Sequence, residues 1–404
     1  MNVPSVVSKE AESELNWLYS TQMFGIKLGL ENITRLLAEL GNPHLSTPCI
    51  HVAGTNGKGS VCAMLDAILR EAGYTVGLYT SPHLVDFSER IRIQGLPIPH
   101  SDLNAGLKKL RHLSSSWEHS PTFFEYATAL AFDWFAGRCE IAIIETGMGG
   151  RLDATNVVNP LVSVITPIAR DHTQWLGSSL AKIAAEKAGI FKAGRPAVSA
   201  AQRPVVRKIL KSVASTREVP LAFVDSQWEE PLTLSGLHQK QNAALAVRAI
   251  TAAGLVVDRE AVTAGLAAVR WPGRFQKLTD HWILDGAHNP HSAEALVTTW
   301  KEEFGSRRVP VIFGCLADKD VASLLAIVKT IASEFHFVPV ANERTISPDQ
   351  LVTLTPIPSQ AHTSPAQAVK ALSNTAGPVL ITGSLFLVGE ILAILNTKPA
   401  DPAS

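Results

Sequence analysis

The feature that most constrains the fold is the stretch His51–Ser60, HVAGTNGKGS, in which an apolar strand pattern leads into a glycine-rich turn and then a helical pattern. A turn with few side chains lets backbone N–H groups close around a phosphate, and the N-terminus of the next helix adds a partial positive charge. Lys58 supplies a full charge, and the hydroxyl of Ser60 is suited to Mg²⁺. We therefore expect a phosphate-binding loop between a strand and a helix.

The match to the general phosphate-loop pattern G-x-x-x-x-G-K-[ST] is partial. Val52 occupies the first glycine position, and Gly59 separates Lys58 from Ser60. From this pattern alone, an ordinary strand-to-helix turn is the alternative interpretation.

Length and composition predict a globular chain of two or three domains. Of its 404 residues, 46% are apolar and 18% are charged, and 36 basic and 36 acidic side chains give a formal net charge of +0. This balance predicts no general attraction to nucleic acid or to a membrane surface, so any anionic ligand depends on local groups.

The cysteines and the N-terminal residues indicate a cytoplasmic protein. Cys49, Cys62, Cys139 and Cys315 form no C-x-x-C pair, so we expect free thiols in a reducing compartment. Residues 1–12 are polar and lack the apolar core of a signal peptide, and no apolar run is long enough to span a bilayer. We expect a soluble monomer.

Apolar runs that end in glycine or polar residues recur along the first part of the chain. They predict strands at 76–79, 140–145 and 161–166, with helices between them. The alternation predicts a doubly wound parallel sheet. Ligands bind at the carboxyl edge of such sheets, so we expect Glu145 and the pair Asp171-His172, which follow buried strands, at a site.

The sequence WPGRF at 271–275 marks a domain boundary, because Pro-Gly breaks the preceding helix and the alternation then restarts. The expected fold class is α/β. An N-terminal doubly wound parallel-sheet, P-loop ATPase-like domain spans residues 1–273, and a smaller C-terminal Rossmann-like α/β domain spans residues 274–404. Strands of the second domain are predicted at 281–284, 309–313, 335–340 and 379–382.

The amino-acid sequences of these motifs resemble those of one known family. AGTNGKGS resembles the ATP loop of the Mur ligase superfamily, and HVAGTNGKGS resembles that of its folate branch, the dihydrofolate synthases/folylpolyglutamate synthases. Further matches follow in the family's order from about Glu14 to Glu390. They are SPHL (81–84), TFFE (122–125), ETGMGGRLDATN (145–156), DH (171–172), EKAGI (186–190), GLHQKQNA (236–243), WPGR (271–274) and DGAHNP (285–290).

The resemblance implies a nucleotide site with Mg²⁺. ATP would be bound by Gly54, Thr55, Asn56, Gly57, Lys58, Gly59, Ser60, Asn242, Arg274 and Asp285. Two Mg²⁺ ions would be held by Ser60, Ser81, Glu145, His172 and a carbamylated Lys187. The catalytic residues implied are Lys58, Glu145, His172 and Lys187.

Chemistry alone supports these metal ligands unequally. Imidazole is unusual for Mg²⁺, which prefers oxygen, so His172 depends on the resemblance. A carbamate converts the cationic amine of Lys187 into a carboxylate-like anion, which suits a metal ion. Without the resemblance, Lys187 is a solvated lysine at a helix end, favoured by the helix dipole.

The resemblance also implies a pterin-bearing acid as substrate, bound by Gly29, Leu30, Glu31, Asn32, Phe123, Phe124, Glu125, Leu152, Asp153 and Ala154. The implied activity is ATP-dependent ligation of L-glutamate to dihydropteroate and to folylpoly-γ-glutamates through an acyl phosphate. Three alternatives stay open: a dihydrofolate synthase only, another Mur-type amino-acid ligase, and a catalytically inactive nucleotide-binding regulator.

Overall fold

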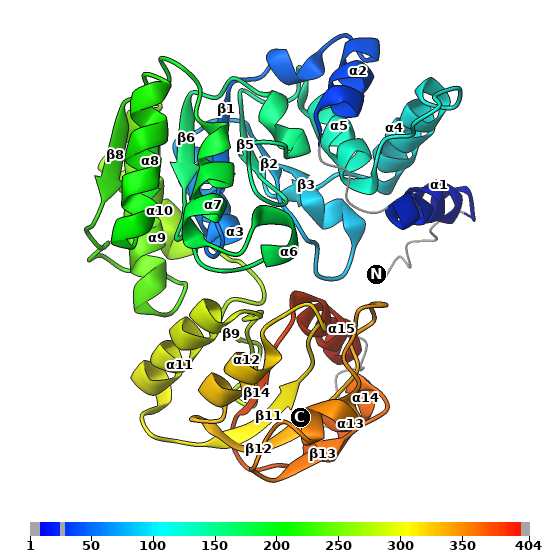
Figure 1. The fold of residues 1–404 in the computed structure, drawn as a ribbon, viewed down its shortest axis with the longest axis vertical. Coiled ribbons are helices and arrows are strands. Elements are labelled where there is room, and N and C mark those ends of the chain that lie inside the picture. Colours follow the sequence, from blue (N-terminus) through cyan, green and yellow to red (C-terminus); the bar gives the residue numbers. More distant parts are fainter. Residues whose placement is uncertain (1–8, 25–28, 397–404) are drawn as a thin grey trace.

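The computed structural model describes residues 9–24 and 29–396, which form two α/β domains, each built on its own sheet (Figure 1). The N-terminal domain runs from α1 (Lys9–Ser20) to α10 (Arg259–Ala268), and the C-terminal domain runs from β9 (Gln276–Lys277) to α15 (Leu385–Asn396). Parallel pairs dominate both sheets, which confirms the predicted fold class. The exact division between residues 273 and 274 stays a prediction.

The N-terminal sheet has eight strands in the order β4-β3-β2-β5-β1-β6-β7-β8. Every residue of β1, β2, β5, β6 and β7 is buried, because helices cover both faces, and this explains the continuous apolar runs in the sequence. The strands are β1 (Cys49–Ala53), β2 (Val76–Tyr79), β3 (Ile91–Ile93), β4 (Leu96–Pro97), β5 (Ile141–Glu145), β6 (Val162–Ile165), β7 (Ala197–Ala200) and β8 (Leu221–Val224).

The hairpin of β3 and β4 is the antiparallel exception in this sheet, and the sequence did not predict it. Strands of three and two residues are too short to give a recognisable periodicity. Gln94 and Gly95 connect them with φ of 52° and 76°, as in a type I′ turn.

The helices of the N-terminal domain cover both faces of its sheet. Ile50 and Val52 pack on α3, α9 and α10, whereas Cys49 packs on the other face with α4 and α5. The helices are α2 (Glu31–Glu39), α3 (Lys58–Glu71), α4 (His100–Leu113), α5 (Phe123–Phe135), α6 (Thr173–Leu176), α7 (Leu180–Lys187), α8 (Pro204–Thr216) and α9 (Leu237–Ala252). Short 3₁₀ helices are η1 (Thr21–Phe24), η2 (Pro43–Leu45), η3 (Phe87–Arg90), η4 (Ala154–Val157) and η5 (Ala188–Ile190).

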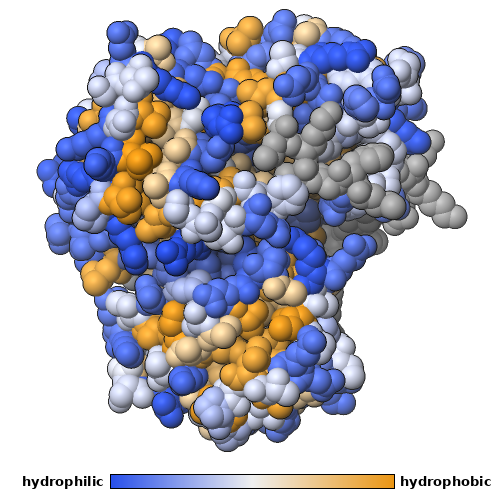
Figure 2. Space-filling view, viewed as in Figure 1, coloured by the Kyte–Doolittle hydropathy of each residue, from blue (hydrophilic) through white to orange (hydrophobic). Residues whose placement is uncertain are grey.

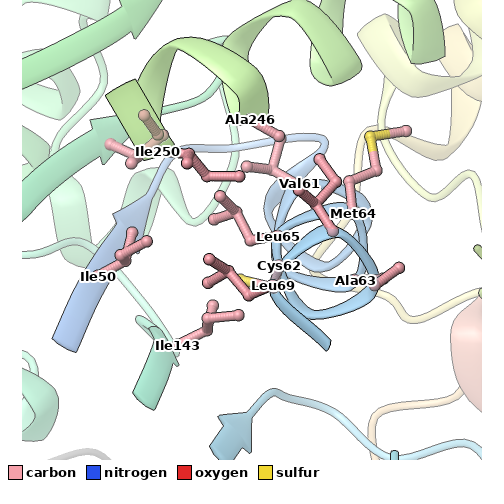
Figure 3. Packing of buried hydrophobic residues seen from close by; sticks show 14 of the residues in the cluster. Ile50, Val61, Cys62, Ala63, Met64, Leu65, Leu69, Ile143, Ala246 and Ile250 are labelled. Atoms are coloured by element: carbon pink, nitrogen blue, oxygen red, sulfur yellow. The ribbon is translucent and has the colours of Figure 1, made fainter. Parts of the chain in front are cut away.

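Helix α3 is enclosed on every side. All residues from Gly59 to Leu69 are buried. The helix packs against β1, which carries Ile50, and against α9, which carries Ala246 (Figure 3). Gly265 of α10 allows the closest approach, since a Cβ at this position would lie 2.6 Å from Cα of Ile68. The loop between β1 and α3 is therefore carried by a firmly packed helix.

The C-terminal sheet has six strands in the order β13-β12-β11-β14-β10-β9, and β9 alone among them pairs in antiparallel fashion. The strand predicted at 335–340 is β12, which begins at Ala332, because Glu334 and His336 interrupt the apolar pattern on which the prediction depended. The remaining elements are β10 (Trp282–Leu284), β11 (Val309–Phe313), β12 (Ala332–Phe337), β13 (Ser359–Ala361), β14 (Val379–Thr382), α11 (Pro290–Phe304), α12 (Val321–Val328), α13 (Pro348–Val352) and α14 (Pro365–Leu372).

All four cysteines are free thiols, as expected. Within residues 9–24 and 29–396, no helix combines the length and the apolar character needed to cross a membrane.

Candidate active site

A cavity of about 1160 Å³ lies where the carboxyl ends of the two sheets face each other. Its wall contains residues that follow β1, β2, β5 and β6 of the N-terminal domain and β10, β11 and β14 of the C-terminal domain. On the face shown in Figure 2, hydrophilic residues follow the boundary between the domains. This position at the carboxyl edge of parallel strands is where α/β folds bind ligands.

Glycines shape the loop after β1. Gly54 has a φ of +154°, and a Cβ there would lie 1.8 Å from Oγ1 of Thr166, so the backbone passes closer to the end of β6 than a side chain would allow. Gly57 has a φ of +88° immediately before α3. Nζ of Lys58 donates to the carbonyl of Thr55 at 3.3 Å and thus lies over the loop.

A buried carboxylate lies beside this loop. Glu145, at the end of β5, is 3% exposed, and its Oε2 accepts the N–H of Ser81 at 3.0 Å. Burial raises the pKa of Glu145, and Lys58 is the group that opposes this most strongly. The hydroxyl of Ser60 is buried as well and accepts a hydrogen bond from Gln239 at 3.3 Å.

These donors fit a hard cation that shares its coordination with phosphate oxygens. The described part of the chain holds no cluster of three or more His, Cys, Asp and Glu residues that could cage a metal ion. Mg²⁺ commonly takes one or two protein oxygens plus substrate phosphates and water, and Ser60, Ser81 and Glu145 offer such oxygens. The residues present therefore fit Mg²⁺ bound together with a nucleotide.

Lys187 is buried at the end of α7, and its Nζ donates to the carbonyl of Gly54 at 2.6 Å. Burial, reinforced by Lys58, lowers the pKa of Lys187 to about 7. His172, which has a φ of 50°, lines the same cavity, and burial lowers its pKa to about 4. At neutral pH the imidazole is thus uncharged, and a large part of the lysine population carries a free amine.

An aromatic region forms another part of the cavity wall. Phe123 and Phe124 begin α5 and line the cavity with Asp153, whose carboxylate is held by the N–H groups of Met148 at 2.8 Å and Thr155 at 3.0 Å. A flat ring would find both stacking surfaces and a fixed acceptor here.

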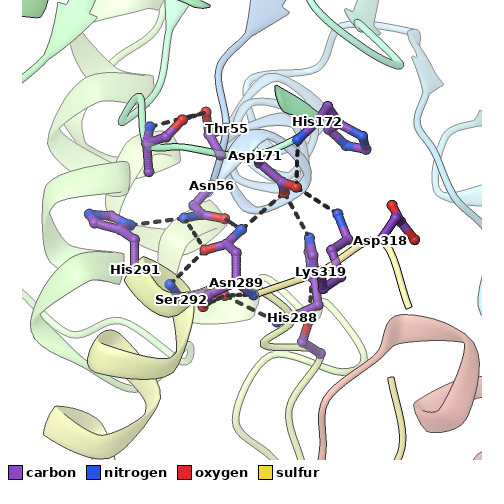
Figure 4. Close-up of polar contacts among 12 residues, drawn as sticks. Thr55, Asn56, Asp171, His172, His288, Asn289, His291, Ser292, Asp318 and Lys319 are labelled. Carbon is purple, nitrogen blue, oxygen red and sulfur yellow. Dashed lines mark hydrogen bonds and ion pairs between the residues drawn. The ribbon is translucent and has the colours of Figure 1, made fainter. Parts of the chain in front are cut away.

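A polar network joins the two domains across the cavity (Figure 4). Asp171 forms an ion pair with Lys319 at 2.6 Å and accepts a hydrogen bond from Nδ2 of Asn289 at 3.1 Å. Asn56 and Asn289 exchange hydrogen bonds of 3.1 and 2.9 Å, and Nδ2 of Asn56 also contacts His291 at 2.8 Å. The loop after β1 and the segment before His172 are thereby connected to the C-terminal domain.

The charge on Asp171 is stabilised in spite of its burial. Burial alone would raise the pKa of this carboxyl, but His288, His172 and Lys319 together hold its pKa well below the usual range. Asp171 is therefore an anion at neutral pH, paired with Lys319.

Most residues predicted for the site line this one cavity. They are Gly54, Thr55, Asn56, Gly57, Lys58, Gly59, Ser60, Ser81, Glu145, His172, Lys187, Asn242, Arg274 and Asp285, together with Gly29, Phe123, Phe124, Glu125, Leu152, Asp153 and Ala154. Three predicted residues do not form part of its wall: Leu30 and Glu31 lie beside it in sequence, and Asn32 donates to the carbonyl of Ser120 at 3.3 Å instead.

Sequence reasoning missed other cavity residues. Lys319 and His291 lie in segments to which no role was assigned, and Arg90 follows the SPHL motif without a predicted function. The available signal for Arg90 was its place in the segment FSERIRI, which follows the SPHL motif. Nothing in the sequence indicated which residue each cation contacts.

Two family models match the chain. The model described as Mur ligase middle domain matches residues 52–224, and the model described as Mur ligase, glutamate ligase domain, matches residues 273–385. A protein of Bacillus subtilis (strain 168), dihydrofolate synthase/folylpolyglutamate synthase, is 35% identical over 93% of this chain and 97% of its own length.

Solved structures agree with these matches over the full length. Escherichia coli FolC in complex with DHPP and ADP is similar with a TM-score of 0.87 and 35% identity, over 98% of this chain and 99% of that chain. A bifunctional folylpolyglutamate synthase/dihydrofolate synthase of Yersinia pestis, complexed with AMPPNP and a Mn ion, has a TM-score of 0.87 and 32% identity, over 98% and 100%.

Proposed function

The chain belongs to the Mur ligases, in the family of dihydrofolate synthases/folylpolyglutamate synthases, and we propose that it joins L-glutamate both to dihydropteroate and to folylpoly-γ-glutamates. It is thus an ATP-dependent acid–amino-acid ligase of folate metabolism. Use of both acceptors is the bifunctional form of this activity. A monomeric state and a cytoplasmic location remain our expectations.

The reaction explains why the cavity combines such different surfaces. A carboxylate is a poor electrophile, so transfer of the γ-phosphoryl group of ATP first converts it into an acyl phosphate. The α-amine of glutamate then attacks the acyl carbon, and the tetrahedral intermediate expels phosphate. Phosphoryl transfer needs positioning and charge neutralisation more than covalent help from the protein, and we assign no covalent intermediate on the chain.

We assign the phosphate and metal roles to the loop after β1 and its neighbours. Lys58 would hold the β- and γ-phosphates, and Arg274 would reach the phosphates from the hinge between the domains. Ser60, Ser81 and Glu145 would ligate one Mg²⁺. Asn242 and Asp285 would lie toward the nucleoside. Mg²⁺, when bound, neutralises phosphate charge and orients the transferred group. The buried carboxylate of Glu145, which Lys58 helps to keep ionised, supports this assignment.

A second ion would be held by His172 and a carbamylated Lys187. Carbamylation requires a neutral amine, and the burial of Lys187 supplies one near neutral pH. The carbamate would replace an ammonium, which repels metal ions, by an oxygen ligand that Mg²⁺ prefers. His172 faces the same cavity as a neutral imidazole.

We place the pterin-bearing end of the acid against Phe123, Phe124 and Asp153. The single observation that carries the whole proposal is that this aromatic wall, the phosphate-binding loop and the buried carboxylate Glu145 line one cavity. An acid bound there by its ring can extend its carboxylate toward the phosphates. Water is excluded from the acyl phosphate when the domains enclose the cavity.

The decisive experiment measures phosphate release that depends on L-glutamate, with ATP, Mg²⁺ and bicarbonate present. Dihydropteroate and tetrahydrofolate are tested as separate acceptors, and we expect release with both. Release with dihydropteroate alone would reduce the function to dihydrofolate synthase. Release with neither would redirect the search to other Mur-type acceptors, and nucleotide binding without any release would indicate an inactive regulator.

A pair of variants connects the activity to the site. Glu145→Gln keeps the shape of the side chain but removes the charge, and we expect turnover to fall by at least 100-fold, within the range seen when a charge-stabilising group is removed (about 10²–10³). Glu186→Gln is the matched control, because Glu186 pairs with Arg151 at the surface. Equal activity of the two variants would contradict the assignment of Glu145.

A further inference from the structure

Arg90 is a buried cation to which the proposed reaction assigns no role. It ends η3, is 7% exposed and lines the cavity. Its Nε donates to Nδ1 of His83 at 2.8 Å. Within residues 9–24 and 29–396, its two terminal nitrogens have no hydrogen-bond or ion-pair partner. Because buried N–H donors without acceptors are costly, we infer that this edge of the guanidinium receives a ligand.

His83 fixes the direction in which the guanidinium points. An arginine Nε can only donate, so Nδ1 of His83 accepts, and the imidazole proton is on Nε2. Nε2 lies 3.5 Å from the hydroxyl of Tyr19. Held at Nε in this way, Arg90 presents its two terminal nitrogens as a planar fork with two parallel donors.

The surroundings of the fork suit a flat ring. The guanidinium carbon lies 5.3 Å from the ring centroid of Phe123 and 5.6 Å from that of Phe87. Tyr19 stacks on Phe123 with centroids 5.8 Å apart and an interplanar angle of 18°. The faces that these two rings turn away from each other are suited to stacking with a planar heteroaromatic group.

The fork lies among aromatic rings, since the guanidinium of Arg90 is near Phe87 and Phe123. Lys58, in contrast, lies over the loop after β1. We therefore match Arg90 to an acceptor edge of the ring and Lys58 to the phosphate end of the site.

Building on the proposed function, we propose that Arg90 forms a bidentate pair with the 4-oxo group and N5 of a 7,8-dihydropterin ring, and so favours dihydro over tetrahydro acceptors. In a dihydropterin these two acceptors lie side by side on one edge. Guanine presents O6 and N7 in the same way, and arginine recognises that edge with the same fork.

The selectivity follows from the chemistry of N5. In a tetrahydropterin, N5 carries a hydrogen or a one-carbon group and no longer offers an acceptor in the ring plane. The fork then keeps its hydrogen bond to the 4-oxo group and loses the other. Asp153 lines the same cavity and offers acceptors, which match the N3–H and 2-amino donors at the neighbouring edge of the ring.

The test compares kcat/KM for 7,8-dihydropteroate, its 5-deaza analogue and tetrahydrofolate. The analogue replaces N5 by C–H without changing the ring shape. The proteins are the wild type, Arg90→Lys, which keeps the charge but removes the fork, and Arg92→Lys as the matched control. Arg92 donates to the carbonyl of Glu89 at 2.9 Å and does not line the cavity.

For the wild type we expect the analogue to react about 10- to 100-fold less efficiently than dihydropteroate, the range of a lost bidentate pair. Arg90→Lys should lose a similar factor on dihydropteroate, with no further loss on the analogue and little change on tetrahydrofolate. Arg92→Lys should behave as the wild type does. Unchanged affinity of Arg90→Lys for ADP, measured by calorimetry, would verify that the variant is folded.

Other outcomes overturn the inference. If the losses from Arg90→Lys and from the analogue multiply, the guanidinium does not contact N5. If Arg90→Lys weakens both acceptors equally, it contacts a group common to them, such as the carboxylate. Failure of the wild type with both natural acceptors would refute the proposed function itself, whereas equal use of the analogue by the active wild type would refute only this inference.

Discussion

Lys187 illustrates how one buried side chain can be prepared for a chemical modification. Its Nζ lies 2.6 Å from the carbonyl of Gly54, and burial lowers its pKa to about 7. A lysine ordinarily has a pKa of about 10.4, so it is charged at neutral pH. In this charged form the ammonium does not react with carbon dioxide. Here, the free amine forms within the physiological range.

We expect Lys187→Ala to be inactive and small carboxylates such as acetate to restore part of its activity, because they can replace the carbamate. Lys182→Ala, on the exposed side of the same helix, is the control. In the wild type, ¹³C-labelled bicarbonate should give a carbamate signal in NMR that weakens as the pH falls below about 7, since protonation removes the reactive amine. Full activity of Lys187→Ala would refute the modification.

A second buried residue makes stability depend on pH. His51 is completely buried, its Nε2 lies 2.8 Å from the hydroxyl of Thr155, and burial lowers its pKa to about 3. The unfolded chain therefore binds a proton near pH 6.5 that the folded chain does not bind. The neutral, buried form of His51 therefore contributes fully to the free energy of unfolding above pH 6.5. This contribution is lost as the pH falls toward 3.

His51→Gln keeps a donor for Thr155 but cannot titrate. Between pH 7.5 and 5, the wild type should lose about 2 kcal/mol more of its free energy of unfolding than the variant does. Urea unfolding at the two pH values measures this difference. Parallel losses in both proteins would mean that His51 is protonated in the folded state.

At the residue scale, the sequence could predict functional groups but not their partners. The sequence motifs that contain Lys58, Glu145 and Asp153 are specific to the family, and all three residues line the cavity. The pairing of Lys319 with Asp171 could not be foreseen, because 148 positions separate them and only the folded chain brings them together. The same holds for Arg90, whose unpaired edge is visible only once its neighbours are placed.

At the scale of the elements, the close packing of α3 against α10 can be tested by substitution. Gly265 of α10 lies against the backbone of α3 at Ile68, where a Cβ would come within 2.6 Å of Cα. Gly265→Ala should lower the free energy of unfolding by about 1–3 kcal/mol through overpacking, although alanine favours helices. Ala264→Ser, on the exposed side of α10, should change it by less than about 0.5 kcal/mol. Chemical denaturation measures the free energy of unfolding of both variants. Equal values for Gly265→Ala and Ala264→Ser would contradict close packing of α10 on α3.

Long buried elements were predictable, and short exposed ones were not. The strands β1, β2, β5 and β6 appear in the sequence as apolar runs because helices cover both faces of the sheet. The hairpin of β3 and β4 and the antiparallel strand β9 contain two or three residues each, too few for a periodic signal. The chain reversal at Gln94 and Gly95 depends on backbone angles rather than on a glycine-rich pattern.

In the whole molecule, polar contacts around Asp171 connect the two domains. Lys319→Met removes the cation at 2.6 Å and leaves a buried carboxylate without its ion pair, which is strongly unfavourable. Opening of the domains lets water reach Asp171, so we expect an increased radius of gyration in small-angle X-ray scattering. We also expect weaker ATP turnover, since the cavity is lined by both domains.

Lys277→Met is the matched control for this prediction. Lys277 pairs with Glu303 at 2.7 Å, but both residues are partly exposed and lie in the C-terminal domain. Its loss should leave the scattering curve and the turnover as in the wild type. A Lys319→Met protein with an unchanged radius of gyration would show that other contacts suffice to keep the domains together.

The enclosure of α3 has a consequence for how this protein can change over generations. Only Lys58, Gly59 and Ser60 of this helix line the cavity, yet every residue from Gly59 to Leu69 is buried. Tolerance to substitution should therefore be as low along the length of α3 as in the phosphate-binding loop itself. We expect variation in acceptor preference among descendants of this chain to arise at cavity residues outside α3.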